Sequence, residues 1–272
     1  MPLRTEPSIE VNLEGAIGHN VHTTVKNRVP QIIFLYWVIK IASTTLGETG
    51  ADMLSMTFKL GYAATILIYM SLFLVLLGIK LFLKGYHPVV YWLVFTASAL
   101  VGTGISDFID RTLGLGYALG SAVLIAMLFV TLALWYKKEK SVHVDTITTS
   151  TAEIFYWTAF LFANTLGTAA GDFLADNMGL GFAHSAILIS GVLIIISLFY
   201  FFTKISRVWL FWLAFVLTRP FGATFGDFLT KPIVKGGINF GTVGSSIFFC
   251  AILIFAVHKE TRLEKLRNRG HG

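Results

Sequence analysis

Four aspartates stand at the same place in four similar segments of this 272-residue chain. Each follows a tryptophan by fifteen residues and a glycine by five, in the segments WVIKIASTTLGETGAD, WLVFTASALVGTGISD, WTAFLFANTLGTAAGD and WLAFVLTRPFGATFGD. The repeated residues are Trp37, Gly47 and Asp52; Trp92, Gly102 and Asp107; Trp157, Gly167 and Asp172; and Trp212, Gly222 and Asp227. Carboxylates are hard oxygen ligands, so four of them in equivalent positions indicate cation chemistry.

Residues four apart share one face of a helix, and this spacing connects each aspartate to three earlier residues. The resulting four stripes are Lys40, Thr44, Glu48 and Asp52; Phe95, Ala99, Thr103 and Asp107; Phe160, Asn164, Thr168 and Asp172; and Phe215, Arg219, Ala223 and Asp227. The strongly polar residues deep in these segments all fall on the stripes. Because charged groups that face lipid are costly, we expect the stripes to face the protein interior or a water-filled path.

A second stripe lies one residue earlier and contains only small residues. Its members are Ser43, Gly47 and Ala51; Ser98, Gly102 and Ser106; Ala163, Gly167 and Gly171; and Thr218, Gly222 and Gly226. Small residues at this spacing let helix backbones approach each other closely. The sequence therefore predicts helices that pack tightly on their neighbours and turn their charged side chains inward.

The composition places these helices in a membrane. Hydrophobic residues make up 55% of the chain and charged residues only 13%, about half the charged share of an ordinary soluble domain. The apolar residues fall in blocks of about 20, the length that crosses a bilayer. We predict an all-α polytopic bundle of eight transmembrane helices, near residues 32–54, 61–83, 89–110, 116–136, 152–174, 180–203, 207–229 and 239–258.

The repeats define the domain organisation. A single membrane domain (30–258) would contain the four repeats 30–84, 85–140, 150–204 and 205–258, between an N-terminal segment (1–29) and a basic tail (259–272). Fifteen of the 21 Lys and Arg residues lie on the side with both termini, four lie on the other side and two lie inside helices. This bias predicts that both termini lie in the cytoplasm. A repeat of two helices returns to the side of the membrane where it began, so all four repeats have the same orientation. This allows pseudo-fourfold symmetry about the membrane normal, or two-fold symmetry between two pairs of repeats.

The candidate ion-binding residues are those polar residues of the stripes that could line a shared axis. They are Glu48, Asp52, Asp107, Asp172, Asp227, Asn164, Thr103 and Thr168. Glu48, Asp52, Asp172 and His184 are candidate metal ligands. Lys40 and Arg219 are candidate counter-ions or a switch, and Arg219 would pair with Glu48 if the fourth repeat closes on the first. In the alternative interpretation, the repeated aspartates are structural caps that bind loop amides. We expect the tryptophans to form an aromatic belt at the cytoplasmic interface.

Other functional classes lack support in the sequence. Nucleotide-binding and metalloprotease motifs, a serine nucleophile elbow and CxxC pairs are missing, and Cys250 is the one cysteine. We therefore expect no enzyme activity, no cofactor and no nucleic-acid partner. The expected partners are membrane lipid and an inorganic cation as substrate, while the oligomeric state stays open.

The tryptophan segments and the GETGAD and GDF endings resemble a family of bacterial membrane proteins built from four tandem two-helix repeats of unknown function. The resemblance covers residues 30–258 and implies eight helices in an inner membrane. It implies no substrate. From the residues themselves we expect a transporter or channel for cations, with a divalent, manganese-like metal and proton coupling favoured. A non-transporting scaffold or sensor is the alternative.

Overall fold

The computed structural model describes residues 30, 33–83, 85–142, 147 and 149–270, and its regular structure there is entirely helical. The long helices are α1 (Phe34–Asp52), α2 (Gly61–Phe82), α3 (Pro88–Asp107), α4 (Gly116–Glu139), α5 (Ser150–Asp172), α6 (Gly181–Phe202), α7 (Arg207–Thr230) and α8 (Thr242–Gly270). These elements confirm the all-α prediction and the eight helices expected from the sequence.

The chain ends differ from the sequence prediction in one respect. Helix α8 was expected to stop near residue 258 but continues to Gly270, so most of the predicted basic tail is helical. Residues 258–269 contain neither proline nor glycine, the residues that most disfavour a helix. The predicted N-terminal segment 1–29 lies outside the described residues, as does part of the stretch between the second and third repeats.

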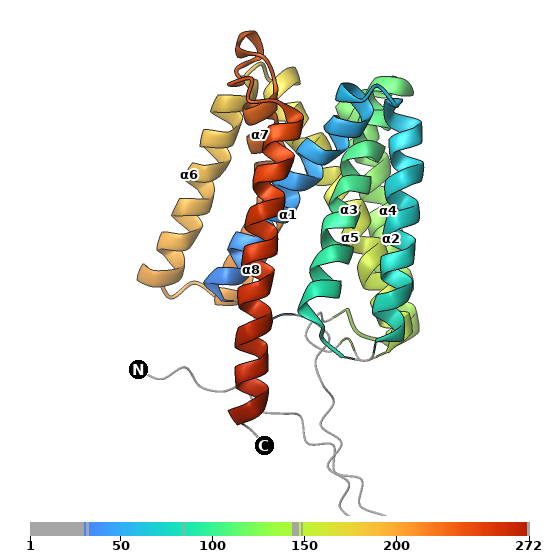
Figure 1. Cartoon of the computed structure of the whole chain (residues 1–272), viewed down its shortest axis with the longest axis vertical. Helices are drawn as coiled ribbons and strands as arrows, with labels where there is room; N and C mark the ends of the chain where they lie inside the picture. Colours follow the sequence, from blue (N-terminus) through green and yellow to red (C-terminus); the bar gives the residue numbers. More distant parts are fainter. Residues whose placement is uncertain (1–29, 31–32, 84, 143–146, 148, 271–272) are drawn as a thin grey trace, which may run out of the picture.

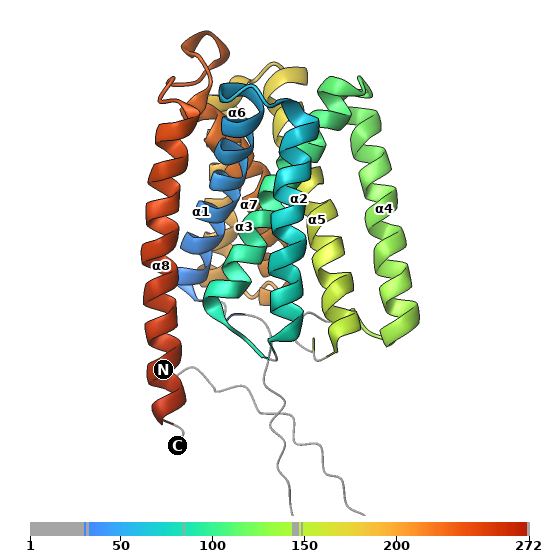
Figure 2. The same cartoon turned by 45° about the vertical axis from the view of Figure 1, so that its right-hand side comes forward.

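The first helices of the four repeats form a closed ring. Helix α1 packs against α3, α3 against α5, α5 against α7, and α7 back against α1. In the rotated view α1, α3 and α7 lie close together in the bundle, and α4 lies at its right-hand edge (Figure 2). The fourth repeat therefore closes on the first, as the pairing of Arg219 with Glu48 requires.

The second helices surround this ring in a regular way. Each packs mainly on the first helix of the following repeat: α2 on α3, α4 on α5, α6 on α7, and α8 on α1. The last pair closes the cycle, and α8 crosses in front of α1 in Figure 1. Because every repeat is covered by its predecessor, no two-helix repeat buries its own apolar surface, and the four must assemble together.

The outer surface has the composition of a membrane protein. Five of the described helices are long and apolar enough to cross a membrane: Gly61–Phe82, Pro88–Thr112, Gly116–Glu139, Gly181–Phe202 and Thr242–Arg267. Four of these are the outer helices, whose most apolar windows are only 22–33% buried. A largely exposed helix of this kind is stable in lipid rather than in water. The fold is therefore compatible with a multi-pass membrane protein.

Glycines of the small-residue stripe form the contacts between ring helices. A Cβ atom at Gly47 would lie 2.6 Å from Ala99 Cβ, and one at Gly222 would lie 2.4 Å from Thr44 Oγ1. Gly102 and Gly167 face Asn164 and Arg219 in the same way. Each repeated glycine thus touches the polar stripe of the next repeat, which confirms the close packing predicted from the spacing.

The ring helices end in a characteristic way beyond their aspartates. Three of them pass directly into a π-helical turn, at Met53–Thr57, Phe108–Thr112 and Phe173–Asn177. Helix α7 instead stays α-helical to Thr230 and is followed by a loop with a short 3-10 turn at Ile233–Lys235. π-Helical turns are uncommon and occur frequently at functional sites.

The tryptophans do not form the predicted interfacial belt where their side chains are described. Trp92 and Trp157 are each only 1% exposed and pack inside the bundle, and Trp37 is partly buried. Trp92 Nε1 donates to Glu260 on α8 at 2.6 Å, and the same carboxylate accepts from Tyr86 at 2.6 Å. The prediction was wrong because each tryptophan lies three residues before its stripe, on the inward face of the helix.

Candidate functional site

The four polar stripes meet on the axis of the ring. All sixteen stripe residues are buried except Phe215, which is partly buried. Equivalent positions form layers, and contacts across the ring join the members of each layer. From the beginning of the ring helices towards their aspartates, a phenylalanine layer is followed by the Arg219 layer, the Glu48 layer and the aspartate layer. We name this set of residues the axial column.

Arg219 is the central residue of the axial column. Its guanidinium donates to the Asn164 and Thr44 carbonyl oxygens at 3.1 Å each, and to the Ala99 carbonyl at 3.2 Å. It also donates to the hydroxyls of Thr103 at 2.7 Å and Thr168 at 2.6 Å. These acceptors belong to the three other repeats, so a single side chain connects the whole ring.

Glu48 lies next to this guanidinium. Its Oε2 atom is 3.8 Å from Arg219 Nη1 and accepts a hydrogen bond from Thr103 at 3.1 Å. The expected ion pair between these two residues is therefore present. Asn164, another candidate residue, donates from Nδ2 to the Ser98 hydroxyl at 3.0 Å. Thr103, Thr168, Glu48 and Arg219 form one continuous polar network in the interior.

Lys40 closes the axial column at the end away from the aspartates. Its ammonium donates to the Phe215 carbonyl at 3.1 Å and lies 3.2 Å from the centre of the Phe215 ring. The rings of Phe95 and Phe160 are 5.6 and 6.0 Å away, within reach of a cation–π interaction. The phenylalanine layer thus holds a buried cation, and the column is blocked there in this conformation.

The four aspartates are joined in two pairs by basic residues. Lys231 Nζ binds Asp52 and lies 3.1 Å from Asp227. Arg111 lies 3.0 Å from Asp107 and 3.5 Å from Asp172. Each basic residue follows the aspartate of its own repeat by four positions and reaches the aspartate of the adjacent repeat. All four carboxylates are 1–2% exposed, so they are buried inside the bundle and do not face lipid.

The aspartate layer overlaps the Glu48 layer at one point. Glu48, Asp52 and Asp227 each place one carboxylate oxygen within 4.8 Å of the others, and within the described residues they form the one such group. Lys231, just beyond α7, stays protonated beside them. Burial lowers the pKa of its ammonium. The negative charges of Asp227 and Asp52 raise it by more than burial lowers it, so the pKa lies well above its ordinary value.

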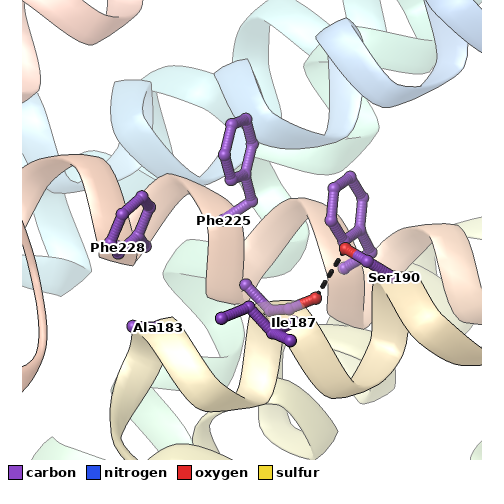
Figure 3. A pocket seen from close by; sticks show the side chains of 7 residues that line it. Ala183, Ile187, Ser190, Phe225 and Phe228 are labelled. Carbon is purple, nitrogen blue, oxygen red and sulfur yellow. Dashed lines mark hydrogen bonds between the residues drawn. The ribbon is translucent and has the colours of Figure 1, made fainter.

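Apolar pockets also occur, but they lie away from the axial column. One of about 180 Å³ lies between α6 and α7 and includes Ile187, Phe225 and Phe228. Figure 3 shows its apolar side chains, with Ser190 donating to a carbonyl of its own helix at 2.7 Å. A second, of about 380 Å³, lies between α4 and α5. Both offer hydrocarbon surfaces and lack charged groups among their lining residues.

The family described as Repeat of Unknown Function (DUF347) matches the chain over residues 35–86, 90–141, 155–206 and 210–265. The chain belongs to this repeat family. The four matched segments correspond to the four repeats found from the tryptophan and aspartate spacing. No curated protein and no solved structure matches the chain.

In this DUF347 chain the candidate metal ligands do not all meet. Glu48 and Asp52 come together with Asp227, whereas Asp172 is placed beside Arg111. His184 is exposed at the start of α6, and its Nδ1 lies 3.0 Å from the Leu180 carbonyl. An outer helix does not reach the axis of the ring, so the structure gives His184 no place in the carboxylate group.

The repeated aspartates do not cap their helices by binding loop amides, as the alternative interpretation required. At Asp52, Asp107 and Asp172 the helix continues into the π-helical turn, and no side-chain hydrogen bond caps that turn. Their partners are instead side chains of neighbouring elements. A structural role for them therefore depends on the ion pairs with Lys231 and Arg111 rather than on loop amides.

Two features of the axial column were missed by the sequence reasoning. Arg111 and Lys231 were counted only as charges on one side of the membrane, although they stand four residues after an aspartate. One further step of four towards the start of each stripe gives Tyr36, Tyr91, Tyr156 and Phe211. Of these, Tyr91 and Tyr156 share a hydrogen bond of 2.9 Å between their hydroxyls. The basic residues and the aromatic residues could both have been found by extending each stripe by four residues, at its end and at its start.

Proposed function

We propose that this chain is a cation transporter of the bacterial inner membrane, and that the ion moves along the axial column. The observation that supports the proposal best is the burial of five carboxylates, together with Lys40 and Arg219, on one axis of a membrane-type bundle. Ionisable residues are costly in such surroundings and commonly mark ion pathways and proton relays. A scaffold would gain the same packing from apolar residues at lower cost.

The proposed substrate is a divalent metal ion of the manganese type. Carboxylate and threonine oxygens are hard ligands of the kind that Mn²⁺, Mg²⁺ and Ca²⁺ prefer. The Lys and Arg bias favours an orientation with the aspartate layer at the outer face and both termini in the cytoplasm. An ion would then pass from the aspartates to Glu48, while Lys40 in the phenylalanine layer closes the inner exit.

Proton coupling is part of the same proposal. Neither oxygen of Asp172 accepts a hydrogen bond from a described residue, although the carboxylate is 1% exposed. The basic residue paired with it, Arg111, lies closer to Asp107. A carboxylate that is so weakly compensated favours carrying a proton in the interior. Exchange of that proton for the metal ion would link the two fluxes.

The alternative is a scaffold or sensor that transports nothing. The observation in its favour is that Lys231 and Arg111 each bind two aspartates, as structural ion pairs would. In this case the column would hold the ring together and would not open. The two functions differ in whether a neutral substitution in the column removes an ion flux or changes stability alone.

The test is ion uptake by proteoliposomes that contain a Mn²⁺-sensitive dye. The wild-type protein should take up Mn²⁺ and respond to an imposed pH gradient. Glu48→Gln should reduce the rate nearly to that of protein-free liposomes, because it keeps the acceptor for Thr103 but removes the charge. Glu264→Gln, on the terminal part of α8, is the matched control and should transport normally. A wild-type rate equal to that of empty liposomes would refute the transport proposal.

A further inference from the structure

Lys231 differs from the carboxylates around it in its access to solvent. Its side chain is 12% exposed, whereas those of Asp52 and Asp227 are 2% and 1% exposed. It begins the loop after α7, where its carbonyl accepts from the Asn239 amide at 3.1 Å and its own amide donates to the backbone carbonyl of Asp227 at 2.8 Å. The backbone is thus fixed, while the flexible side chain separates the carboxylate group from the outside.

The carboxylates beneath Lys231 have unused capacity for a ligand. Both carboxylate oxygens of Asp227 are buried, and the ammonium of Lys231 lies 3.1 Å from Oδ1. Oδ2 accepts no hydrogen bond from a described residue. A buried carboxylate oxygen without a donor is costly. Lys231 therefore compensates Asp227 only in part, and Oδ2 is free to bind a further positive partner.

The charge of the group defines what that partner is. Glu48, Asp52 and Asp227 carry three formal negative charges, and Arg219 beside Glu48 carries one positive charge. Without Lys231 the net charge is minus two, which one divalent cation neutralises. Three carboxylate oxygens within 4.8 Å of one another suit a hard cation.

We infer that Lys231 is a tethered counter-ion that occupies a divalent-cation site formed by Glu48, Asp52 and Asp227. Arrival of the metal ion displaces the ammonium towards solvent, and departure of the ion lets it return. The inference rests on the proposed function, since it assigns the ion's first binding site. The site differs from the set of metal ligands expected from the sequence, because Asp227, expected there only as an ion-binding residue, takes part, whereas Asp172 and His184 do not.

Arg111 does not have the same role, although it bridges the other two aspartates. Asp107 and Asp172 have no third carboxylate at hand, and within the described residues the only carboxylate triad is the one beside Lys231. A guanidinium also binds carboxylates with a fixed fork of donors and is less readily displaced than an ammonium. Arg111 is therefore a matched control of equal charge.

The first experiment measures equilibrium Mn²⁺ binding to the full-length protein in detergent, by the paramagnetic resonance signal of free Mn²⁺. Lys231→Gln should tighten binding by about tenfold or more, because a unit charge a few ångström away contributes more than that in a protein interior. Arg111→Gln should tighten it less, and Lys235→Gln, exposed on the same loop, should leave it unchanged. Asp227→Asn should abolish it. Equal affinities for Lys231→Gln and the wild type, or equal effects of Lys231→Gln and Arg111→Gln, would overturn the inference.

A second experiment needs no variant and so does not depend on the folding of one. The wild-type protein is treated with an amine-reactive reagent, and the modification of Lys231 is followed by mass spectrometry. Mn²⁺ should increase the rate of modification several-fold, because the displaced ammonium reaches solvent. A rate that Mn²⁺ lowers or leaves unchanged would refute displacement. Binding without uptake into liposomes would support the site and contradict the transport proposal, whereas uptake without displacement would do the reverse.

Discussion

Replacing Arg219 with methionine is expected to lower the free energy of unfolding by about 3–5 kcal/mol, the range for breaking a buried ion pair on one side. The substitution leaves Glu48 without its cation, and the hydroxyls of Thr103 and Thr168 lose their shared donor. It also removes the one side chain that reaches all three other repeats. Denaturant titration of the purified protein in detergent measures the change.

A double substitution separates charge from packing. If the loss comes mainly from the unpaired carboxylate, Arg219→Met combined with Glu48→Gln should recover a large part of it, since neither partner is then charged. Arg262→Met, at an exposed position on α8, is the control and should change stability by about 0.5 kcal/mol or less. An Arg219→Met protein as stable as the wild type would contradict the central place given to this residue.

Gly47→Ala is expected to destabilise the ring by about 1–3 kcal/mol through overpacking. The new methyl group would lie 2.6 Å from Ala99 Cβ and 3.0 Å from the Ala99 carbonyl carbon. Neither atom belongs to a flexible side chain, so α1 and α3 must move apart. The thermal midpoint of the detergent-solubilised protein, followed by size-exclusion chromatography, reports the loss.

The outer helices provide the matched control for this substitution. Gly78 lies within α2, and no atom lies within 4 Å of a Cβ built there. Gly78→Ala should be neutral or slightly stabilising, because alanine is the better helix former by about 1 kcal/mol. If both alanine variants behave alike, close approach of the ring helices is not what the repeated glycines provide.

Spacing alone predicted much of this molecule. Steps of four from each aspartate identified the face that points to the axis, because a helix brings such residues into line. The adjacent small residues predicted how closely the ring helices meet. Even the pairing of Arg219 with Glu48 followed, once the fourth repeat was assumed to close on the first. These features depend on local periodicity and on symmetry, and both are visible in a sequence.

What could not be predicted depends on the order of helices around the ring. The partner of Lys231 within its own repeat is four residues away, but its bond to Asp52 exists only because α7 lies beside α1. His184 was grouped with the carboxylates because its residue type binds metals, and its position on an outer helix keeps it from the axis. Trp92 was assigned to the membrane interface because it lies near a helix end. The spacing already indicated that it lies on the inward face of its helix, three residues before the stripe.

The two basic bridges also carry information about the origin of the ring. Arg111 and Lys231 belong to the second and fourth repeats, 120 residues apart, and the first and third repeats have Met56 and Asp176 at that position. The aspartate layer therefore has two-fold rather than fourfold symmetry. This agrees with an ancestral pair of repeats that was duplicated once more.

The most direct test of the axial column is the chemical accessibility of a single cysteine within it. Ala223→Cys, in a chain with Cys250→Ser, places a thiol in the Glu48 layer, and Ala42→Cys places one in an equally buried position off the axis. In membranes, a cationic, water-soluble thiol reagent should modify the cysteine at position 223, and Mn²⁺ should slow the reaction. The cysteine at position 42 should stay unmodified. If both thiols are equally unreactive, with and without Mn²⁺, no ion reaches the axis and the account is wrong.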